Sequence, residues 1–446
     1  MLSEPDGLPT PRRHWALAGL WCGMALSVLD ATIANIALPT IAHDLRVSPA
    51  AATWVVTAYQ IAIVMTLLPL ATLGERLGYR RVYLGGLVLF VLMSIGCAMA
   101  RNLETLAAAR FAQGLGASAM MSVNGALMRF TWPKERLARG IAYNAVVVAC
   151  TAAAGPALAG AMLSLGPWPW LFLVNVPTGL AALALVVAFG PHTPAATRLF
   201  DWRSGLLNAV MFGALFLLAS DIVHGHASAR LGPLALIGGG AGLWLIRRVR
   251  GSPRPLIPLD LIRMPRLRLA YGASLCGFAA QMCLLVSLPF LLEGRLGLPV
   301  AAVAGIFLPL PLGIALISPL AGRWAERPWA GRMSAAGLML CATMMASMPL
   351  LLPHAGAPAL IAAAMGLCGM GFGLFQAPNN NVMLRAGPID RAGSAAGMQA
   401  QCRLIGQTAG ALIAALSLRF GGATSDRALM IGAVLALCSA AFARAR

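Results

Sequence analysis

Long runs of apolar residues, separated by short polar segments, make up almost the whole chain. A run of about 20 apolar residues spans the hydrocarbon core of a bilayer as an α-helix, whereas shorter runs only fill a protein core. The predicted runs are 15–38, 51–73, 82–100, 105–127, 140–164, 168–190, 205–223, 231–248, 269–292, 299–322, 333–352, 357–381, 393–418 and 428–443. The pattern therefore predicts an all-α integral membrane protein with fourteen transmembrane spans.

The overall composition agrees with a protein embedded in lipid. Of the 446 residues, 59% are hydrophobic and 11% are charged, whereas soluble domains have roughly 45–50% and about 25%. The net charge of +19 would suggest nucleic-acid binding in a soluble protein. Here the basic residues lie in the short gaps between apolar runs, so we expect a lipid bilayer as partner and no nucleic acid.

The basic residues also predict how the chain is oriented. Positively charged loops stay on the cytoplasmic side, and most of the 33 Lys and Arg fall in segments on the side of the N-terminus when fourteen spans are counted. An even number of spans places both termini on that side. We therefore expect a multi-pass protein of the cell (inner) membrane with both termini cytoplasmic.

A weak repeat divides the chain into halves. Glu75-Arg76 follows the second span and Glu326-Arg327 follows the tenth, so the two pairs occupy the same place in a six-span unit if spans seven and eight are an insertion. Repeated halves around a central site are how many secondary transporters are built. The predicted organisation is a cytoplasmic N-terminus at 1–14, an N-terminal six-helix bundle at 15–190, an inserted two-helix segment with its cytoplasmic linker at 191–268, and a C-terminal six-helix bundle at 269–446.

Six short motifs carry a resemblance to a known family. They are LDATIANIALP at 29–39, the loop at 71–85, RFAQGLGA at 110–117, GP at 155–156 with Gly160, WPWLFLVNVP at 168–177 and QAPNNN at 376–381. In this order they resemble the major facilitator superfamily, specifically its fourteen-span drug:proton antiporter branch. The chain departs from the usual pattern at Ala71, Glu75, Thr151 and Ala159. The resemblance implies a major facilitator fold, with two six-helix bundles plus two inserted helices, in a transporter that functions as a monomer.

Asp30 is the acidic residue that lies deep inside a predicted span. A carboxylate near the bilayer centre costs about 2.5–3.5 kcal/mol, so such residues usually face a cavity and mark an ion or proton path. Arg110 lies at a similar predicted depth, close enough to interact if the two helices adjoin. We expect Asp30 and Arg110 to form the proton-coupling pair. The alternatives are a helix-packing role for Asp30 and snorkelling of Arg110 toward the headgroups.

Two polar helix stripes predict the wall of a cavity. At 3.6 residues per turn, Arg110 shares one face of its helix with small and polar side chains, and Arg403 shares a face of another helix with Gln399 and Gln407. For Arg403, substrate contact and hydrogen bonding between the bundles are equally open. The predicted cavity or substrate residues are Asn35, Gln113, Met121, Asn124, Gln399, Arg403 and Gln407.

The loop after the second span is the predicted cytoplasmic gate, as the family resemblance implies. The gate residues are Glu75, Arg76, Gly78, Arg80 and Arg81, with Glu326 and Arg327 in the second half. In such a gate an acidic residue pairs with an arginine across the bundle, although plain topogenic charge explains the same residues. Gly155 and Pro156 predict a helix bend, with a purely architectural kink as the alternative.

No residue pattern indicates a metal, a cofactor or an enzyme. The nine cysteines lie inside apolar runs without CxxC spacing, so we expect no metal site and no catalytic residue, and transport would use the proton motive force. The expected function is proton-coupled export of hydrophobic or cationic small molecules such as drugs, dyes or biocides. The alternatives are export of a specific cellular metabolite and, from another class, a membrane sensor or membrane-embedded enzyme. Glu293 is the second candidate for coupling.

Overall fold

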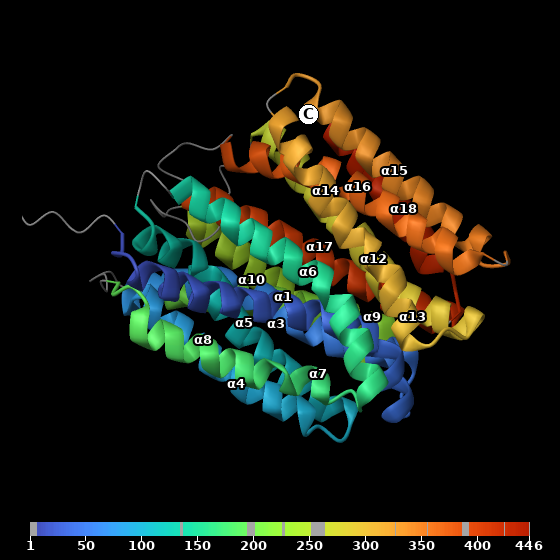
Figure 1. The fold of residues 1–446 in the computed structure, drawn as a ribbon, viewed down its shortest axis with the longest axis horizontal. Coiled ribbons are helices and arrows are strands. Elements are labelled where there is room, and N and C mark those ends of the chain that lie inside the picture. The colour runs from blue at the N-terminus through green and yellow to red at the C-terminus, as the bar shows by residue number, and fades with distance from the viewer. Residues whose placement is uncertain are drawn as a thin grey trace, which may run out of the picture.

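Every regular element described in the computed structural model is an α-helix (Figure 1). The structure describes residues 7–133, 137–193, 201–224, 228–250, 264–325, 327–354, 356–385, 392–422 and 424–445. The helices coincide with the predicted apolar runs. The predicted all-α fold is therefore confirmed for this part of the chain.

Three of the predicted runs hold two shorter helices instead of one. The bounds are α1 (Arg12–Asp44), α2 (Pro49–Ala52), α3 (Trp54–Leu77), α4 (Tyr79–Ala98), α5 (Leu103–Thr131), α6 (Leu137–Leu165), α7 (Trp170–Leu173), α8 (Asn175–Phe189), α9 (Trp202–His224), α10 (Ser228–Arg250), α12 (Pro265–Leu296), α13 (Val300–Phe307), α14 (Pro309–Trp324), α15 (Ala330–Leu351), α16 (Ala357–Arg385), α17 (Ala392–Gly421) and α18 (Arg427–Arg444). The breaks fall at Thr53, Val174 and Leu308. Leu308 precedes Pro309, which has no backbone N–H to continue the helix.

Within the described residues, 11 helical segments are long and apolar enough to cross a membrane. The remaining three predicted spans fall on α5, α6 and α10. The polar stripe of α5 lowers its hydropathy, α6 contributes only a shorter apolar segment at Cys150–Leu165, and α10 is rich in glycine. The count of fourteen spans thus goes beyond what length and composition alone support.

The helices form an N-terminal bundle, α1 to α8, and a C-terminal bundle, α12 to α18. In the first, α5 packs against α3 and α4, while α1 packs against α6 and α8. In the second, α16 packs against α14 and α15, while α12 packs against α17 and α18. Two seams join the bundles, because α6 contacts α13 and α14 on one side and α17 contacts α2 and α3 on the other.

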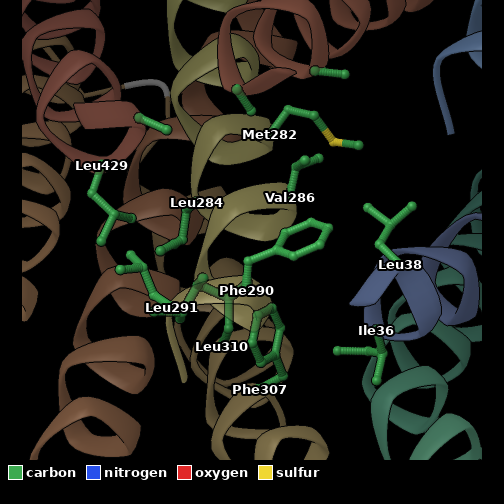
Figure 2. Close-up of a cluster of buried hydrophobic side chains, with 14 of the residues drawn as sticks. Ile36, Leu38, Met282, Leu284, Val286, Phe290, Leu291, Phe307, Leu310 and Leu429 are labelled. Carbon is green, nitrogen blue, oxygen red and sulfur yellow. The ribbon is translucent and has the colours of Figure 1, made fainter. Parts of the chain in front are cut away.

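An apolar cluster seals the bundles together near the ends of α1 and α12. Ile36 and Leu38 of α1 face Val286 and Phe290 of α12 and Phe307 of α13 (Figure 2). In the packed structure each of these five side chains is at most 4% exposed. In Figure 1, α1 and α12 are close together where they end and far apart where they begin. The apolar seal is therefore at one end of the molecule.

The predicted bend residues lie inside α6, where that helix touches its neighbours. A Cβ atom built on Gly155 would lie 2.1 Å from Thr32 Oγ1 of α1. A Cβ atom on Gly160 would lie 2.6 Å from Ala304 Cβ of α13. Pro156 is buried in the same stretch. Small residues thus let α6 lie between α1 and the C-terminal bundle, and a bending role for Gly155 and Pro156 stays a prediction.

The helices α9 and α10 pack against each other, and α9 also contacts α3 and α17. Asn208 of α9 donates to Met65 O of α3 at 2.8 Å, and Arg419 of α17 donates to Ile222 O of α9 at 3.2 Å. The predicted insertion therefore lies along the seam between α3 and α17.

An ion pair that the sequence analysis did not find joins the start of α9 to the end of α10. Asp201 Oδ1 lies 2.9 Å from Arg248 Nη2, and Asp201 also accepts hydrogen bonds from the backbone and hydroxyl of Ser204. Burial alone would raise the pKa of Asp201. The hydrogen bonds from Arg248 and Ser204 lower it by more, so the pKa lies below the ordinary value. The carboxylate therefore serves both as a helix cap and as a link between the two helices.

Candidate functional site

Asp30 lies in the middle of α1 and is 2% exposed. Its Oδ2 atom forms an ion pair with Arg110 Nη1 of α5. Its Oδ1 atom accepts hydrogen bonds from Gln113 Nε2 at 3.0 Å and from Asn175 Nδ2 of α8 at 2.9 Å. The sequence placed Asp30 and Arg110 at similar depth, and the structure brings them into direct contact.

Arg110 is fully buried and is held by three different kinds of contact. Its Nε atom donates to Val55 O of α3 at 2.8 Å, and its Nη1 atom donates to Gln113 Oε1 at 2.6 Å. The guanidinium carbon lies 4.3 Å from the centroid of the Tyr59 ring, within the range of a cation–π interaction. A snorkelling conformation is therefore contradicted, because Arg110 points into the N-terminal bundle.

Gln113 connects this ion pair to a fourth helix. It lies one turn after Arg110 on the same face of α5, and its Nε2 atom donates to Ser94 Oγ of α4 at 2.8 Å. Gly114 permits the close approach of α5 to α3, since a Cβ atom there would lie 2.5 Å from Tyr59 O. The resulting polar network, defined as Asp30, Ser94, Arg110, Gln113 and Asn175, links α1, α4, α5 and α8.

Two polar atoms of this network have no hydrogen-bond partner among the described residues, namely Arg110 Nη2 and Asn175 Oδ1. Leaving a buried polar atom unsatisfied costs about 1–3 kcal/mol. The arrangement therefore satisfies the carboxylate of Asp30 but not all of its neighbours.

Sequence reasoning missed Asn175, Ser94 and Tyr59. Asn175 stands out as a polar residue within the quoted motif at 168–177, and that contrast is the signal that could have found it. Ser94 and Tyr59 give no such signal. Small hydroxyls are common in membrane helices, and only the packing of α3 and α4 against α5 brings these two residues to the site.

The other predicted cavity residues do not join this network. Asn124 donates to Asn144 Oδ1 of α6 at 3.3 Å, Asn35 donates to Ala31 O in its own helix, and Met121 packs against the core of the N-terminal bundle. Gln399, Arg403 and Gln407 are half-buried on α17. They belong to a separate part of the molecule.

The predicted gate residues are placed differently from the expected cross-bundle pair. Arg80 donates to Val187 O at 2.5 Å and to Val186 O at 3.4 Å, so it binds the carbonyls at the end of α8. Gly78 has φ +94° and lies beside Thr193, whose hydroxyl accepts from the Arg80 backbone. These contacts fasten the α3–α4 turn to α8.

The charged neighbours of Arg80 are exposed, and no ion pair of Glu75 is found within the described part of the chain. The exposed residues are Glu75, Arg76, Arg81 and Arg327. Glu326 lies outside the described residues. Arg80 thus joins the loop to α8 of the same bundle. Among the described residues, Arg80 forms no ion pair with an acidic side chain.

No three His, Cys, Asp or Glu side chains among the described residues are grouped so that they could hold a metal ion. The chemistry available in the network is that of one carboxylate, one guanidinium and neutral hydrogen-bonding groups. Such a set can bind, release and exchange a proton or an ion.

Comparison with known proteins gives several relatives that match most of the chain. The chain is 43% identical to the "Uncharacterized transporter YebQ" of Escherichia coli (strain K12), over 98% of this chain and 96% of that protein. It is 33% identical to the "Multidrug resistance protein Stp" of Mycobacterium tuberculosis (strain CDC 1551 / Oshkosh), over 87% and 72%. It is 30% identical to the "Riboflavin transporter RibZ" of Clostridioides difficile (strain 630), over 86% and 83%.

The fold is also similar to solved transporter structures. A bacterial homolog of the human lysosomal transporter Spinster superposes with a TM-score of 0.70 at 15% identity, covering 98% of this chain and 97% of that chain. The family model described as Major Facilitator Superfamily matches residues 20–411. This protein is therefore a multi-pass membrane transporter, not an enzyme, and it belongs to the major facilitator superfamily.

Proposed function

We propose that the chain is a proton-coupled exporter of amphipathic small molecules, and that Asp30 and Arg110 couple proton movement to transport. The observation that carries the proposal is the buried ion pair between them. Buried ionisable groups inside membrane helices are costly and are usually kept for function. The relative named multidrug resistance protein supports export of drug-like compounds.

The geometry provides a way for a proton to act on the fold. A proton on Asp30 Oδ2 would face Arg110 Nη1, which is itself a donor, so protonation requires the pair to separate. Arg110 remains fixed to α3 through Val55 O, whereas Asp30 moves with α1. Uptake of the proton therefore loosens α1 from α5.

Loosening of α1 acts on the contact between the bundles. Ile36 and Leu38 lie two turns beyond Asp30 on α1 and form the apolar seal with α12 and α13. A proton and a substrate can then bias the same two-state equilibrium, which is the requirement for coupled exchange. An inward proton moving through 100 mV supplies about 2.3 kcal/mol, and no cofactor is needed.

The unsatisfied atoms of the network support a second arrangement. Arg110 Nη2 and Asn175 Oδ1 lack partners in the described conformation. A conformation in which Asp30 is protonated frees Asn175 and Arg110 to form other hydrogen bonds, which offsets part of the loss of the ion pair. In the proposed mechanism the network therefore has two arrangements, one with the ion pair and one without it.

Everted membrane vesicles test this function directly. Vesicles that contain the protein are energised by respiration, and each compound of a panel of amphipathic molecules is added to the outside medium. We expect uptake of at least one compound that stops when an uncoupler removes the proton gradient. Uptake that persists without a gradient would contradict proton coupling.

Export of one specific metabolite is the second candidate. The relative named riboflavin transporter, which matches over 86% of this chain, supports it. The same vesicle panel separates the two functions. A multidrug exporter moves chemically unrelated compounds, whereas a metabolite exporter moves one compound and its close analogues.

Fourteen spans with both termini cytoplasmic are the proposed topology. Reporter fusions after residues 225 and 265 are expected to report the outside and the cytoplasm respectively, because α9 and α10 would cross the membrane as a pair. A fusion after residue 12 should agree with the one after 265. The same side for the fusions at 225 and 265 would show that the inserted pair does not span the bilayer.

Arg80→Ala is expected to slow transport about tenfold with little change in substrate affinity. Loss of a charge-assisted hydrogen bond of about 1.5 kcal/mol corresponds to roughly that factor, and the contact fastens α4 to α8 within the N-terminal bundle. Turnover and binding would be measured separately in purified protein. Arg266→Ala, which removes an exposed arginine at the start of α12 outside the predicted gate, serves as the matched control and should stay near the wild-type rate. Equal losses in both variants would favour plain topogenic charge.

A further inference from the structure

Two arginines lie inside the helical bundles, but only one of them is neutralised by the protein. Arg110 is paired with Asp30. Arg403 lies on α17 and is half-buried, and the described part of the chain gives it no hydrogen bond and no ion pair. The contrast identifies Arg403 as a cation deep in the molecule that lacks a counterion.

The position of Arg403 on α17 shows which way this cation faces. Residues 403, 407, 411, 414 and 418 follow one another at spacings of three and four, so they lie along one stripe of the helix. Ala411, Ala414 and Leu418 of that stripe belong to the apolar cluster shared by both bundles. Arg403 and Gln407 continue the stripe by two turns, toward the end at which α1 and α12 diverge.

The remaining faces of α17 are occupied by other helices. Gln401 donates to Val64 O of α3 at 2.9 Å. Gly406 and Gly410 face α12, since Cβ atoms there would lie 2.6 Å from Leu275 O and 2.3 Å from Ala279 O. Arg403 and Gln407 are half-buried, whereas Cys402, Leu404, Gly406 and Thr408 beside them are buried, which fits side chains that lie along the junction of the two bundles.

No acidic side chain on the helices that adjoin α17 lies at the level of Arg403. On α3 the acid is Glu75, about 16 Å along the helix from Val64, the residue that Gln401 contacts. On α9 it is Asp221, beside Ile222, which binds Arg419 about 24 Å farther along α17 than Arg403. The helices α16 and α17 contain no Asp or Glu, and α12 contains only Glu293. Glu293 lies about 27 Å farther along α12 than Leu275, at 1.5 Å per residue. Asp30 is already engaged by Arg110. The ion pair contributes no net charge, so Arg403 leaves a net positive charge at the junction of the bundles.

We propose that Arg403 and Gln407 form a subsite for an anionic group of the transported compound. A guanidinium presents a planar set of donors that fits a carboxylate, sulfonate or phosphate, and the amide of Gln407 can donate alongside it. The substrate class is an apolar body with one such group. This inference rests on the proposed export function and narrows its substrate, because a positive subsite disfavours organic cations.

Three naphthalene probes of equal size test the subsite: 2-naphthoate, 2-naphthylmethanol and 2-naphthylmethylammonium. Binding to the purified full chain would be measured by calorimetry. We expect the carboxylate to bind about tenfold more tightly than the ammonium probe, as a charge-assisted hydrogen bond allows. Arg403→Gln should remove that preference and leave the alcohol unchanged. Arg403→Lys should retain part of the preference, because it keeps the charge but not the planar fork.

Matched controls separate a subsite from a structural role. Arg419→Gln removes an arginine from the end of the same helix and should leave all three affinities unchanged. Equal loss of all three probes in a folded Arg403→Gln protein would overturn the proposal, as would a wild-type protein that prefers the ammonium probe. A lipid phosphate carries the same chemistry, so the titration is repeated in phosphatidylcholine nanodiscs with and without phosphatidylglycerol. Unchanged naphthoate binding supports a soluble anion, whereas displacement by phosphatidylglycerol overturns that assignment.

The subsite and the export function fail in different ways. Substrate-driven proton movement that is indifferent to Arg403→Gln leaves export standing and removes the subsite. Naphthoate binding that depends on Arg403, without any proton movement, retains the subsite and removes proton-coupled export.

Discussion

Asp30→Asn is expected to abolish substrate-driven proton movement in proteoliposomes while the protein is still made and inserted. The amide keeps an oxygen that can accept from Arg110 and Gln113, so the network retains a similar shape. It cannot take up and release a proton at neutral pH. Binding of substrate should persist, because the change leaves α17 untouched.

The measurement is the proton flux that follows addition of a transported compound to liposomes containing a pH indicator. Asp44→Asn, at the exposed end of the same helix, is the matched control and should retain the wild-type flux. If Asp30→Asn exchanges protons at the wild-type rate, coupling lies elsewhere. Glu293 would then be the next carboxylate to replace.

Arg110→Leu is expected to destabilise the protein by about 3–5 kcal/mol, the usual cost of leaving one charge of a buried pair without its partner. Asp30 would keep only Gln113 and Asn175 as neutral donors. The bond to Val55 O and the contact with the Tyr59 ring would also be lost. Thermal unfolding in detergent, followed by loss of monodisperse protein, would reveal the change.

A double variant isolates the charge from the lost packing. Arg110→Leu combined with Asp30→Asn removes the unpaired carboxylate, so it should be more stable than Arg110→Leu alone. Arg110→Lys keeps the charge and should fall between the wild type and Arg110→Leu. A double variant that is no more stable than Arg110→Leu would mean that the guanidinium acts mainly through packing.

The contact between Asp30 and Arg110 could be anticipated because depth in a membrane follows from counting residues along a helix. Their partners could not be anticipated in the same way. Asn175 and Ser94 reach the pair only because α8 and α4 pack beside α1 and α5. Hydropathy gives the length of each helix, but it does not say which helices adjoin.

Arg80 is a second residue whose partners could not be predicted from the sequence. Its position in a basic loop predicts a charge on one side of the membrane, and that is all that topology requires. The structure directs the side chain to the carbonyls of Val186 and Val187 instead of to an acid. Helix ends expose such acceptors, and the distance in sequence between α4 and α8 hides the match.

The pattern of apolar runs also did not predict the helix breaks. The runs at 51–73, 168–190 and 299–322 are continuous in hydropathy, yet each contains a break, at Thr53, Val174 and Leu308. In contrast, the order and approximate limits of the helices follow from the runs themselves. About 20 apolar residues in a row make a membrane span easy to predict from hydropathy, whereas a helix break at a single residue hardly changes the hydropathy of the run.

The contact of α9 with both α3 and α17 makes the two sides of the molecule unequal toward lipid. A compound dissolved in the bilayer meets α9 where it covers the junction of α3 and α17. On the opposite side, the junction is formed by α6 with α13 and α14, and α1 also contacts α13. We therefore expect lateral entry from the membrane to be hindered at the side that α9 covers, so that the proposed inserted pair would leave the repeated architecture with one more open approach from lipid.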